Sequence, residues 1–201
     1  MSLRFDINVI ADLVEKGSTV LDIGCGQGDM LETLIARKQI KGRGIEIDPA
    51  RVSICMKKGL SVMQGDVDVD LKHYPQNAFD YAVLTQTLQV TKHPDKILVD
   101  MLRVAKRIIV SIPNFGYWEN RRQILLKGRM PVTNKLSYQW YETPNIHFCT
   151  IRDFIILCKD LGIKIEKRIA IFPSGRIMSF TGFGWAANIL ADQGVFVLTK
   201  E

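Results

Sequence analysis

The 201-residue sequence lacks any apolar run of about 18 or more residues, the length typical of a membrane-spanning helix. It also lacks the basic segment followed by a short apolar segment that is typical of a secretory signal. Hydrophobic residues make up 47% and charged residues 24% of the chain, a composition typical of a globular protein with a sizeable core. We therefore expect a cytoplasmic protein without a membrane partner, folded as a single domain over residues 1–201.

Cysteine is scarce, with four residues in the chain: Cys25, Cys55, Cys149 and Cys158. They form no Cys-x-x-Cys pair and have no regular spacing. This argues against a disulfide framework and against a zinc site. We expect four free thiols and no bound metal.

Concentrated positive charge is also missing, although the formal net charge is +6 and the pI is near 9.2. The basic residues are spread along the chain, with local groups at 103–107 and 121–129. A solvated helix face explains the first group equally well. The pattern therefore argues against nucleic acid as a partner.

A glycine-rich turn is the most informative segment that is present. Residues 20–28 read Val-Leu-Asp-Ile-Gly-Cys-Gly-Gln-Gly, an apolar run that ends in an acid and continues with glycine at every second position. A strand that ends in such a turn and leads into a helix brings backbone N–H groups close to a ligand. The spacing differs from the dinucleotide fingerprint Gly-x-Gly-x-x-Gly, and Asp22 would repel a phosphate. An acid at this place suits a ligand that carries a positive amino group and no phosphate.

This segment resembles motif I of the class I S-adenosylmethionine (SAM) methyltransferase fold, whose ligand carries an adenosine, a sulfonium and an amino acid end. The resemblance implies an α/β, Rossmann-like architecture with a mostly parallel seven-stranded sheet and helices on both faces. It assigns cofactor binding to Asp22, Gly24, Cys25, Gly26 and Gly28. The cofactor would be SAM, and its product S-adenosylhomocysteine (SAH).

Glu46 ends a second strand-like run, about 20 residues beyond the glycine turn, at the place where open α/β folds put an acid on the ribose hydroxyls. Pro49 suits the first position of the next helix. Asp48 is the alternative ribose ligand, but as the residue before Pro49 it is better placed as a helix N-cap. We therefore assign ribose binding to Glu46 and include the adjacent Ile47 among the candidate cofactor-binding residues.

Asp66 follows a third short strand pattern at 61–64. The resembled fold uses an acid at the end of its third strand to accept a hydrogen bond from the adenine amine, which makes Asp66 a candidate. Asp68 and Asp70 follow within four residues, so a solvated acidic loop is the alternative. Acids at the carboxyl ends of three successive strands favour the ligand interpretation, because open parallel sheets bind ligands at that edge.

Strand and helix patterns alternate along the chain, without repeats or low-complexity segments, which predicts a mostly parallel sheet covered on both faces. The predicted strands are residues 19–23, 42–47, 61–64, 79–85, 107–112, 163–171 and 195–199. The predicted helices are residues 7–15, 29–38, 49–58, 94–104, 151–161 and 185–190, with a further helix within 114–127.

Residues 113–150 interrupt this alternation with a concentration of aromatic residues. They are Phe115, Tyr117, Trp118, Tyr138, Trp140, Tyr141 and Phe148. We predict a long ordered loop at 128–144, because loops of this length are usually functional or disordered and the aromatic content argues against disorder. The segment is expected to form a lid or a partner surface. The alternative is that its aromatic residues cover the open edge of the domain's own core.

Four strings take the resemblance to one family. They are Leu-Thr-Gln-Thr-Leu-Gln at 84–89, Ser-Ile-Pro-Asn-Phe-Gly at 111–116, Gly-Arg-Met-Pro-Val-Thr at 128–133 and Trp-Tyr-Glu-Thr-Pro-Asn-Ile-His at 140–147. These strings resemble the MetW family of methionine biosynthesis proteins, over about residues 4–200. The family's glycine loop usually has an acid where this chain has Gln27. The resemblance implies association with homoserine O-acetyltransferase but identifies no methyl acceptor.

Methyl transfer depends mainly on positioning the nucleophile, with a base added only when the nucleophile carries a proton. The candidates for such a base are His147, Tyr141, Tyr117 and His93. For His147 the alternative is a structural histidine, packed and hydrogen-bonded beneath the lid. No catalytic residue is assigned beyond these candidates.

Gln86 and Gln89 follow the fourth predicted strand, where enzymes that methylate exocyclic amines of bases have an Asn-Pro-Pro-Tyr type sequence. The difference disfavours base N-methylation. Gln86 remains a candidate cofactor-binding residue, although hydrogen-bonded glutamines at the sheet edge are the alternative.

Two functions are compatible with these patterns. The first is SAM-dependent methyl transfer to a small polar acceptor in or near methionine metabolism. The second is a non-catalytic SAM-binding partner or activator of homoserine O-acetyltransferase, with 113–150 as the interface and Trp118, Trp140 and Tyr141 as anchors. An RNA methyltransferase ranks third.

Overall fold

The computed structural model describes residues 5–133, 136 and 138–200. Its helices are α1 (Phe5–Leu13), α2 (Asp29–Lys38), α3 (Pro49–Lys57), α4 (Val67–Asp70), α5 (Pro94–Val104), α6 (Trp118–Lys127), α7 (Ile151–Asp160) and α8 (Trp185–Leu190), with 3-10 turns η1 (Leu71–His73) and η2 (Leu88–Val90). Its strands are β1 (Thr19–Ile23), β2 (Lys41–Glu46), β3 (Val62–Gln64), β4 (Phe79–Thr85), β5 (Ala105–Pro113), β6 (Ile163–Ile171), β7 (Ile177–Ser179) and β8 (Gln193–Lys200).

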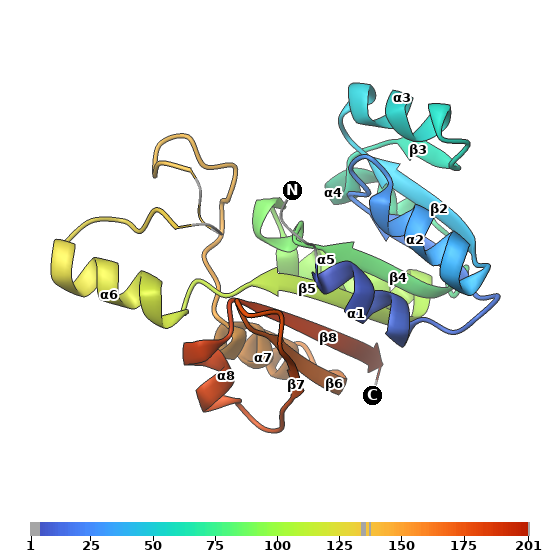
Figure 1. Ribbon diagram of the computed structural model, residues 1–201. Coiled ribbons are helices and arrows are strands. Elements are labelled where there is room, and N and C mark those ends of the chain that lie inside the picture. The colour runs from blue at the N-terminus through green and yellow to red at the C-terminus, as the bar shows by residue number, and fades with distance from the viewer. Residues whose placement is uncertain (1–4, 134–135, 137, 201) are drawn as a thin grey trace.

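The strands form one sheet in the order β3-β2-β1-β4-β5-β8-β6-β7 (Figure 1). The pairs among β1 to β5 are parallel, whereas β8 pairs antiparallel with both β5 and β6. The predicted sheet of seven strands is therefore one strand too small, because β7 pairs antiparallel with β6. β7 has only three residues, too few to show an alternating pattern in the sequence.

Successive side chains of the strands enter two separate cores, one on each face of the sheet. Val20, on one face, belongs to the core formed with α1, α2 and α3. Leu21, the next residue, belongs to the core formed with α5, α7 and η1. Because successive residues of a strand point to opposite faces, the nearly continuous apolar run of β4 is explained by burial on both sides.

Several predicted boundaries are confirmed, including those of β1, α2, β4, α5, β6 and α8. The helix expected within 114–127 is confirmed from Trp118 to Lys127, whereas 114–117 form the turn before it. Asn114 is instead buried, and its side-chain amide donates to the carbonyl oxygens of Asn188 (2.9 Å) and Ala191 (2.7 Å). The turn before α6 is thereby bound to the end of α8.

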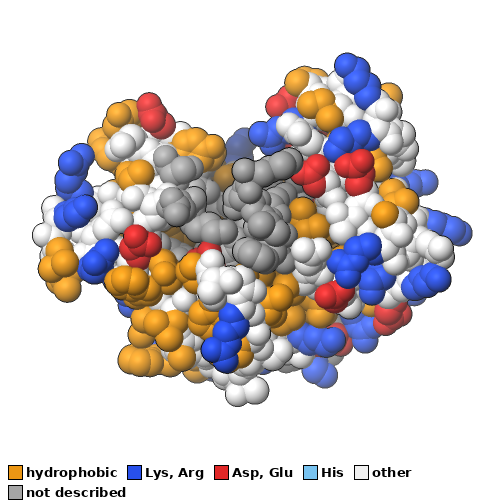
Figure 2. All heavy atoms as spheres, viewed as in Figure 1, with side chains coloured by type: hydrophobic (Ala, Val, Ile, Leu, Met, Phe, Trp, Pro, Cys, Tyr) orange, Lys and Arg blue, Asp and Glu red, His pale blue; other side chains and the backbone are white. Residues whose placement is uncertain are grey.

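The segment between β5 and α7, residues 114–149, is called the arm here. Its helix α6 extends away from the sheet on the side opposite α3 and β3 (Figure 1). The predicted long loop at 128–144 contains no helix or strand in its described part, whereas 134, 135 and 137 lie outside the described residues. Apolar side chains gather on the part of the surface where α6 and α8 lie (Figure 2). Leu125 and Leu126 of α6 are 83% and 73% exposed.

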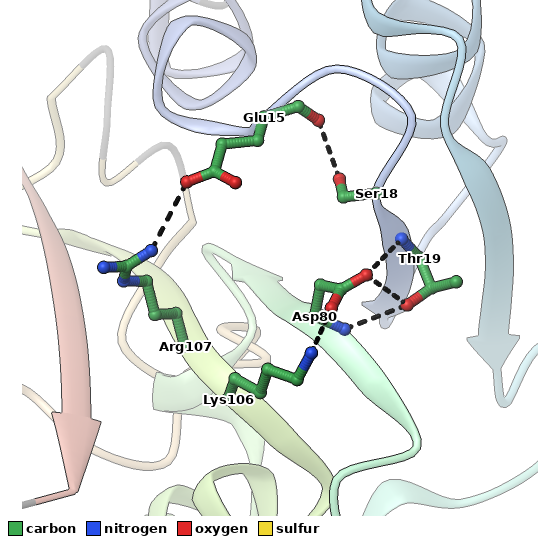
Figure 3. Close-up of polar contacts among 6 residues, drawn as sticks. All are labelled: Glu15, Ser18, Thr19, Asp80, Lys106 and Arg107. Carbon is green, nitrogen blue, oxygen red and sulfur yellow. Dashed lines mark hydrogen bonds and ion pairs between the residues drawn. The ribbon is translucent and has the colours of Figure 1, made fainter.

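A polar network joins the amino-terminal ends of three central strands, at the edge opposite the glycine loop (Figure 3). Asp80 of β4 accepts hydrogen bonds from the backbone N–H (2.9 Å) and hydroxyl (2.8 Å) of Thr19. Its other carboxylate oxygen lies 2.7 Å from the Lys106 ammonium. The hydrogen bond from Lys106, followed by those from Thr19, lowers the pKa of Asp80 to about 2. Arg107 is paired with Glu15 and Glu166 in the same area.

Candidate functional site at the carboxyl edge of the sheet

The glycine loop, residues 24–28, joins the end of β1 to the start of α2. Gly24, Gly26 and Gly28 have φ angles of 66°, 58° and 86°, in the left-handed region that favours glycine. Gly28 is also the N-cap of α2. The alternating glycines are thus explained by the backbone path of the loop, which could be anticipated from their spacing.

The loop is tightly packed at both ends and open in the middle. A Cβ atom at Gly24 would lie 2.8 Å from Thr87 Cγ2, and one at Gly28 would lie 2.3 Å from Leu60 Cδ1. A Cβ atom at Gly26 would meet no atom within 4 Å. The described residues therefore leave space on one side of Gly26, whereas the loop ends are fixed against η2 and the end of α3.

Residues from neighbouring elements hold this loop in place. The carbonyl oxygen of Ile45 accepts hydrogen bonds from the N–H groups of Gly24 (2.8 Å) and Cys25 (3.1 Å). The Lys58 ammonium, at the end of α3, donates to the Gln27 carbonyl (2.9 Å) and pairs with Glu32 (2.6 Å). The hydrogen bond with Glu32 is the largest cause of the raised pKa of Lys58. Gln27 acts through its backbone carbonyl in this contact.

Cys25, within the loop, and Cys55 of α3 are both buried free thiols. The Cys55 thiol donates to the Gly26 carbonyl at 3.3 Å. Burial, followed by the charge of Asp22, raises the pKa of the Cys25 thiol far above its ordinary value. Both effects disfavour a thiolate at Cys25, so this side chain contributes packing rather than nucleophilic chemistry.

Glu46 is buried, with 4% of its surface exposed, at the end of β2. One carboxylate oxygen accepts a hydrogen bond from the Gly26 N–H at 2.7 Å, and the other accepts from the Asp48 N–H at 3.0 Å. A carboxylate oxygen has two lone pairs, so each can accept a further bond. The acid is therefore fixed beside the open centre of the glycine loop with capacity for a ligand.

Asp48 has the helix-capping role expected from its place before Pro49. Its carboxylate accepts a hydrogen bond from the Ala50 N–H at 2.8 Å, and Pro49 opens α3. Ile47, between the two acids, is 62% exposed. An apolar side chain thus stands at the surface directly beside the buried Glu46.

Asp22 is fully buried in β1, where it pairs in register with Gly44 of β2 and Val83 of β4. The strand order places the carboxyl ends of β1, β2 and β4 side by side. Asp22 and Glu46 are therefore both buried acids on adjacent strands near this edge.

The acidic segment 66–70 is an ordered structure rather than the solvated loop considered as an alternative. Asp66 is the N-cap of α4 and accepts from the Asp68 N–H at 3.0 Å. Asp70 accepts from the Asp66 N–H at 2.8 Å, and Asp68 accepts from the N–H groups of Lys92 and His93. The structure thus gives Asp66 a capping role, and a contact with adenine remains a prediction.

Gln86 at the end of β4 has a φ of 49°, which non-glycine residues rarely adopt. Its backbone N–H donates to the hydroxyl (3.1 Å) and carbonyl (3.0 Å) of Ser111, and its side-chain amide donates to Asp6 of α1 at 3.1 Å. Asp6 is fully buried. Gln86 therefore fixes α1 at the same edge of the sheet as the glycine loop.

The candidates for a catalytic base lie in different places. The His147 N–H donates to the Gln89 carbonyl at 3.0 Å, which places His147 beside η2. Tyr117 is the N-cap residue of α6, and its ring contacts Trp118. Tyr141 is 67% exposed on the arm, and His93 is the exposed N-cap residue of α5. His93 belongs to the segment that follows β4, residues 86–93, and His147 is hydrogen-bonded to that segment.

Several contacts of the site were not anticipated from the sequence. They involve Asp6, Cys55, Lys58 and Thr87. Each contacts the glycine loop or Gln86 from a distant part of the chain, and no local motif predicts it.

In the described part of the chain, no group of three or more His, Cys, Asp or Glu residues could hold a metal ion. None of the described helices has both the length and the apolar character required to cross a bilayer.

Comparison with known proteins places this geometry in a family. Residues 4–198 match the family model "Methionine biosynthesis protein MetW". A "Bifunctional methionine biosynthesis protein MetXA/MetW" from Rhodopirellula baltica is 30% identical over 178 residues, which cover 84% of this chain. The match spans only 29% of the length of that relative.

Solved structures agree on the fold. A SAM-dependent methyltransferase from Mesorhizobium loti superimposes with a TM-score of 0.72 at 14% identity, covering 98% of this chain and 99% of that one. A SAM-dependent methyltransferase from Thermotoga maritima gives a TM-score of 0.71 at 19% identity, covering 98% and 88%. The chain thus has the class I SAM-dependent methyltransferase fold and belongs to the MetW family of methionine biosynthesis proteins.

Proposed function

We propose that this protein binds SAM at the glycine loop and transfers its methyl group to a small polar acceptor in methionine metabolism. The observation that carries the proposal is the position of Glu46, buried and bound through both oxygens beside the open face of Gly26. Its remaining lone pairs can accept from the two hydroxyls of a ribose, which are the donors that a nucleoside presents.

The other candidate residues support the same ligand. Exposed Ile47 offers an apolar surface for a purine ring beside the ribose position. Buried Asp22 supplies negative charge near the centre of the edge, suited to the ammonium of an amino acid end and unfavourable for a phosphate. The fold shared with methyltransferases of known structure agrees with this arrangement.

The chemistry requires little of the chain itself. When bound, SAM supplies an activated methyl group on its sulfonium. Gln86, held by Asp6 and Ser111, fixes α1 at the same edge. His147 is the proposed base for an acceptor that carries a proton; its backbone N–H is bound to the Gln89 carbonyl, in the segment that follows β4.

Calorimetric titration with SAM and SAH tests the cofactor assignment. Wild-type protein is expected to bind both, and Glu46→Ala is expected to weaken binding at least about tenfold. The loss of one charge-assisted hydrogen bond costs roughly 1.5–3 kcal/mol, and about 1.4 kcal/mol is a factor of ten. Glu15→Ala is the matched control, since Glu15 is an exposed acid at the opposite edge of the sheet.

Failure of wild-type protein to bind either compound would overturn the assignment. Equal affinity of wild type and Glu46→Ala would remove Glu46 from the site while leaving SAM binding in place. Incubation with methyl-labelled SAM and a cell metabolite extract then tests transfer itself. Label is expected in a small-molecule fraction and not in RNA.

A second candidate function is supported by the arm. We propose that the arm binds homoserine O-acetyltransferase and that the protein activates or stabilises this enzyme. In the Rhodopirellula relative, a region named MetXA occupies the same polypeptide as the MetW region, so the two activities are covalently joined there. A separate chain would need a surface to achieve the same proximity.

The arm has the features of such a surface. The side chains of Leu125, Leu126 and Trp140 are 83%, 73% and 71% exposed. Single exposed apolar residues are common on protein surfaces, whereas a group of them is typical of an interaction surface. Lys127 and Arg129 line an open hollow of about 530 Å³ together with Trp140. Exposed Trp flanked by Arg is the composition of residues that dominate interface energetics. Arg122 already stacks over Trp118 at 5.1 Å.

Copurification with the acetyltransferase, in the presence and absence of SAM, tests the partner function. A complex is expected with wild type, and Leu125→Glu combined with Leu126→Glu is expected to abolish it. Val99→Glu is the control, because Val99 is 51% exposed and belongs to α5, not to the arm. No complex with wild type, together with unchanged acetyltransferase activity, would refute this function without affecting SAM binding.

A further inference from the structure

The glycine loop contains a tight turn over residues 25–28. The Gly28 N–H donates to the Cys25 carbonyl at 2.9 Å, and this hydrogen bond closes the turn. Gly26 has a φ of 58°, whereas the φ of Gln27 is not positive. A positive φ at the first central residue alone is the pattern of a type II′ turn. The peptide group between Gly26 and Gln27 is therefore the central peptide of this turn.

The central peptide of such a turn has one alternative orientation. A flip of this peptide would convert the turn to type I′, which requires a positive φ at both central residues. Glutamine at the second central position disfavours the flip, because non-glycine residues rarely adopt a positive φ. The flip would also replace an N–H donor with a carbonyl acceptor on the same side of the loop.

Two side chains from the end of α3 bind the carbonyl groups of this turn. The Cys55 thiol donates to the Gly26 carbonyl at 3.3 Å, and the ammonium of Lys58, the C-cap residue of α3, donates to the Gln27 carbonyl at 2.9 Å. Burial raises the pKa of the Cys55 thiol, so the thiol keeps its proton and remains a donor. Both carbonyl groups are therefore held toward the same end of α3.

Lys58 is itself oriented by two acids of α2. Its ammonium lies 2.6 Å from a carboxylate oxygen of Glu32 and 3.3 Å from one of Asp29. Together with the Gln27 carbonyl, these oxygens provide three acceptors for the three N–H donors of the ammonium. The contact with Gln27 thus belongs to a group whose position is set from two helices.

The direction of the remaining donor follows from these contacts. The C=O and N–H of a trans peptide point in opposite directions. Because the Gly26 carbonyl points toward Cys55, the Gln27 N–H points away from α3. This N–H has no acceptor among the residues that the structure describes, whereas the Gly26 N–H is bound by Glu46. The turn therefore presents one available backbone donor next to the proposed ribose ligand.

We propose that Cys55 and Lys58 are positioning residues for the cofactor, because they hold the Gly26–Gln27 peptide with its N–H available to the ligand. The inference rests on the proposed binding of SAM at the glycine loop. Neither side chain has to touch the ligand, since each acts through a backbone carbonyl of the turn.

Calorimetric titration with SAH tests the role of Lys58. Lys58→Met keeps the aliphatic stem and removes the ammonium, and it is expected to weaken binding about two- to tenfold, the effect of one net hydrogen bond. Glu32→Gln is the matched control, because it removes the charge of the closest ion pair and leaves the bond to Gln27 in place. Its affinity for SAH is expected to change less than about twofold.

A second pair of variants tests Cys55. Cys55→Ala removes the donor and is expected to weaken SAH binding about two- to tenfold, whereas Cys55→Ser keeps a donor and is expected to remain within about twofold of wild type. Amide NMR spectra without ligand report on the peptide itself. Lys58→Met and Cys55→Ala are expected to shift the Gln27 and Gly28 signals, and Glu32→Gln is expected to leave them in place.

Several results would overturn the proposal, and urea denaturation first establishes that each variant is folded. Unchanged affinity of both Lys58→Met and Cys55→Ala, with SAH bound by wild type, would refute the positioning role alone. Equal losses for Lys58→Met and Glu32→Gln would assign the effect to the ion pair and refute the role of the carbonyl contact. Absence of SAH binding by wild type would instead overturn the proposed cofactor, and the positioning role with it.

Discussion

At the glycine loop, buried polar atoms of the chain hold one another in place, whereas the arm presents side chains that the rest of the chain does not cover. Glu46 is 4% exposed and accepts two backbone hydrogen bonds. Leu125 is 83% exposed, and its neighbour Leu126 is 73% exposed. The first region is specified by contacts within the molecule. The second is largely left uncovered by the described part of the chain.

This difference predicts which substitutions should change stability and which should change only binding to a partner. Substitutions around the glycine loop should change both the free energy of unfolding and ligand affinity, because the same contacts support the fold and the site. Substitutions at exposed apolar positions of the arm should leave stability unchanged and affect only association. Four predictions test or refine this contrast.

The largest effect is expected for Gly28→Val. The new Cβ would lie 2.3 Å from Leu60 Cδ1, and valine would have to adopt a φ near 86°. Overpacking together with left-handed strain should lower the free energy of unfolding by about 4 kcal/mol and abolish SAH binding. Urea denaturation measures the change.

Gly26→Ala is the control for this variant, because its Cβ meets no atom within 4 Å. Its cost should be about 1 kcal/mol, from the left-handed φ alone. Similar destabilisation by Gly28→Val and Gly26→Ala would contradict the contrast between packed and open positions of the loop.

The same substitution at two leucines compares the regions directly. Leu34→Ala removes a fully buried side chain from the core beneath α2 and should cost about 3 kcal/mol. Leu125→Ala on the arm should change the free energy of unfolding by less than about 0.5 kcal/mol. A loss of more than about 1 kcal/mol for Leu125→Ala in denaturant titrations would show that the arm is packed in solution.

Asp48→Ala separates the two neighbouring acids. Loss of the N-cap of α3 should lower stability by about 1 kcal/mol. SAH affinity should change less than about twofold, because the assigned ribose ligand is Glu46 and not Asp48. Calorimetry of this variant beside Glu46→Ala makes the comparison, and a larger loss of affinity with Asp48→Ala would reverse the assignment.

The smallest effect concerns pH and Asp80. Its pKa in the folded protein, about 2, lies below its ordinary value of 3.8, so the folded state binds protons less readily than the unfolded state. The resulting stabilisation is complete above about pH 4 and is lost as pH falls through about 2.

The Lys106 and Asp80 side chains are 66% and 34% exposed, and solvent screens such a pair. Asp80→Asn should therefore lower stability at neutral pH by less than about 1 kcal/mol, below what the pKa shift alone would give. Denaturation at pH 6 and pH 3 should show a smaller loss of stability on acidification for the variant. Identical pH dependence of wild type and variant would show that Asp80 contributes nothing to the acid response.

Much of the fold could be predicted because its elements carry local signals. The apolar run of β4, the stripe of α2 and Pro49 at the start of α3 each mark an element or its boundary. The same is true of Asp48, whose capping role follows from its place before Pro49, and of the position of Glu46 at the end of β2. These features depend on residues that are neighbours in the sequence, so they can be predicted from it.

Other features depend on contacts between distant segments. The bond from Gln86 to Asp6 joins residues 80 positions apart, and neither residue belongs to a motif that predicts the other. The left-handed φ of Gln86 has no sequence signal either, because glutamine does not favour it.

The position of β8 determines the order in which the sheet can be completed. β6 and β7 precede β8 in the chain, yet β8 lies between β5 and β6. During synthesis, residues 163–179 are therefore made before the strand that joins them to the parallel half. Until 193–200 inserts, β5 and β6 each retain an unpaired edge, which is a template for intermolecular pairing. A chain in which β8 is not yet in place would therefore present two strand edges that can pair with other chains.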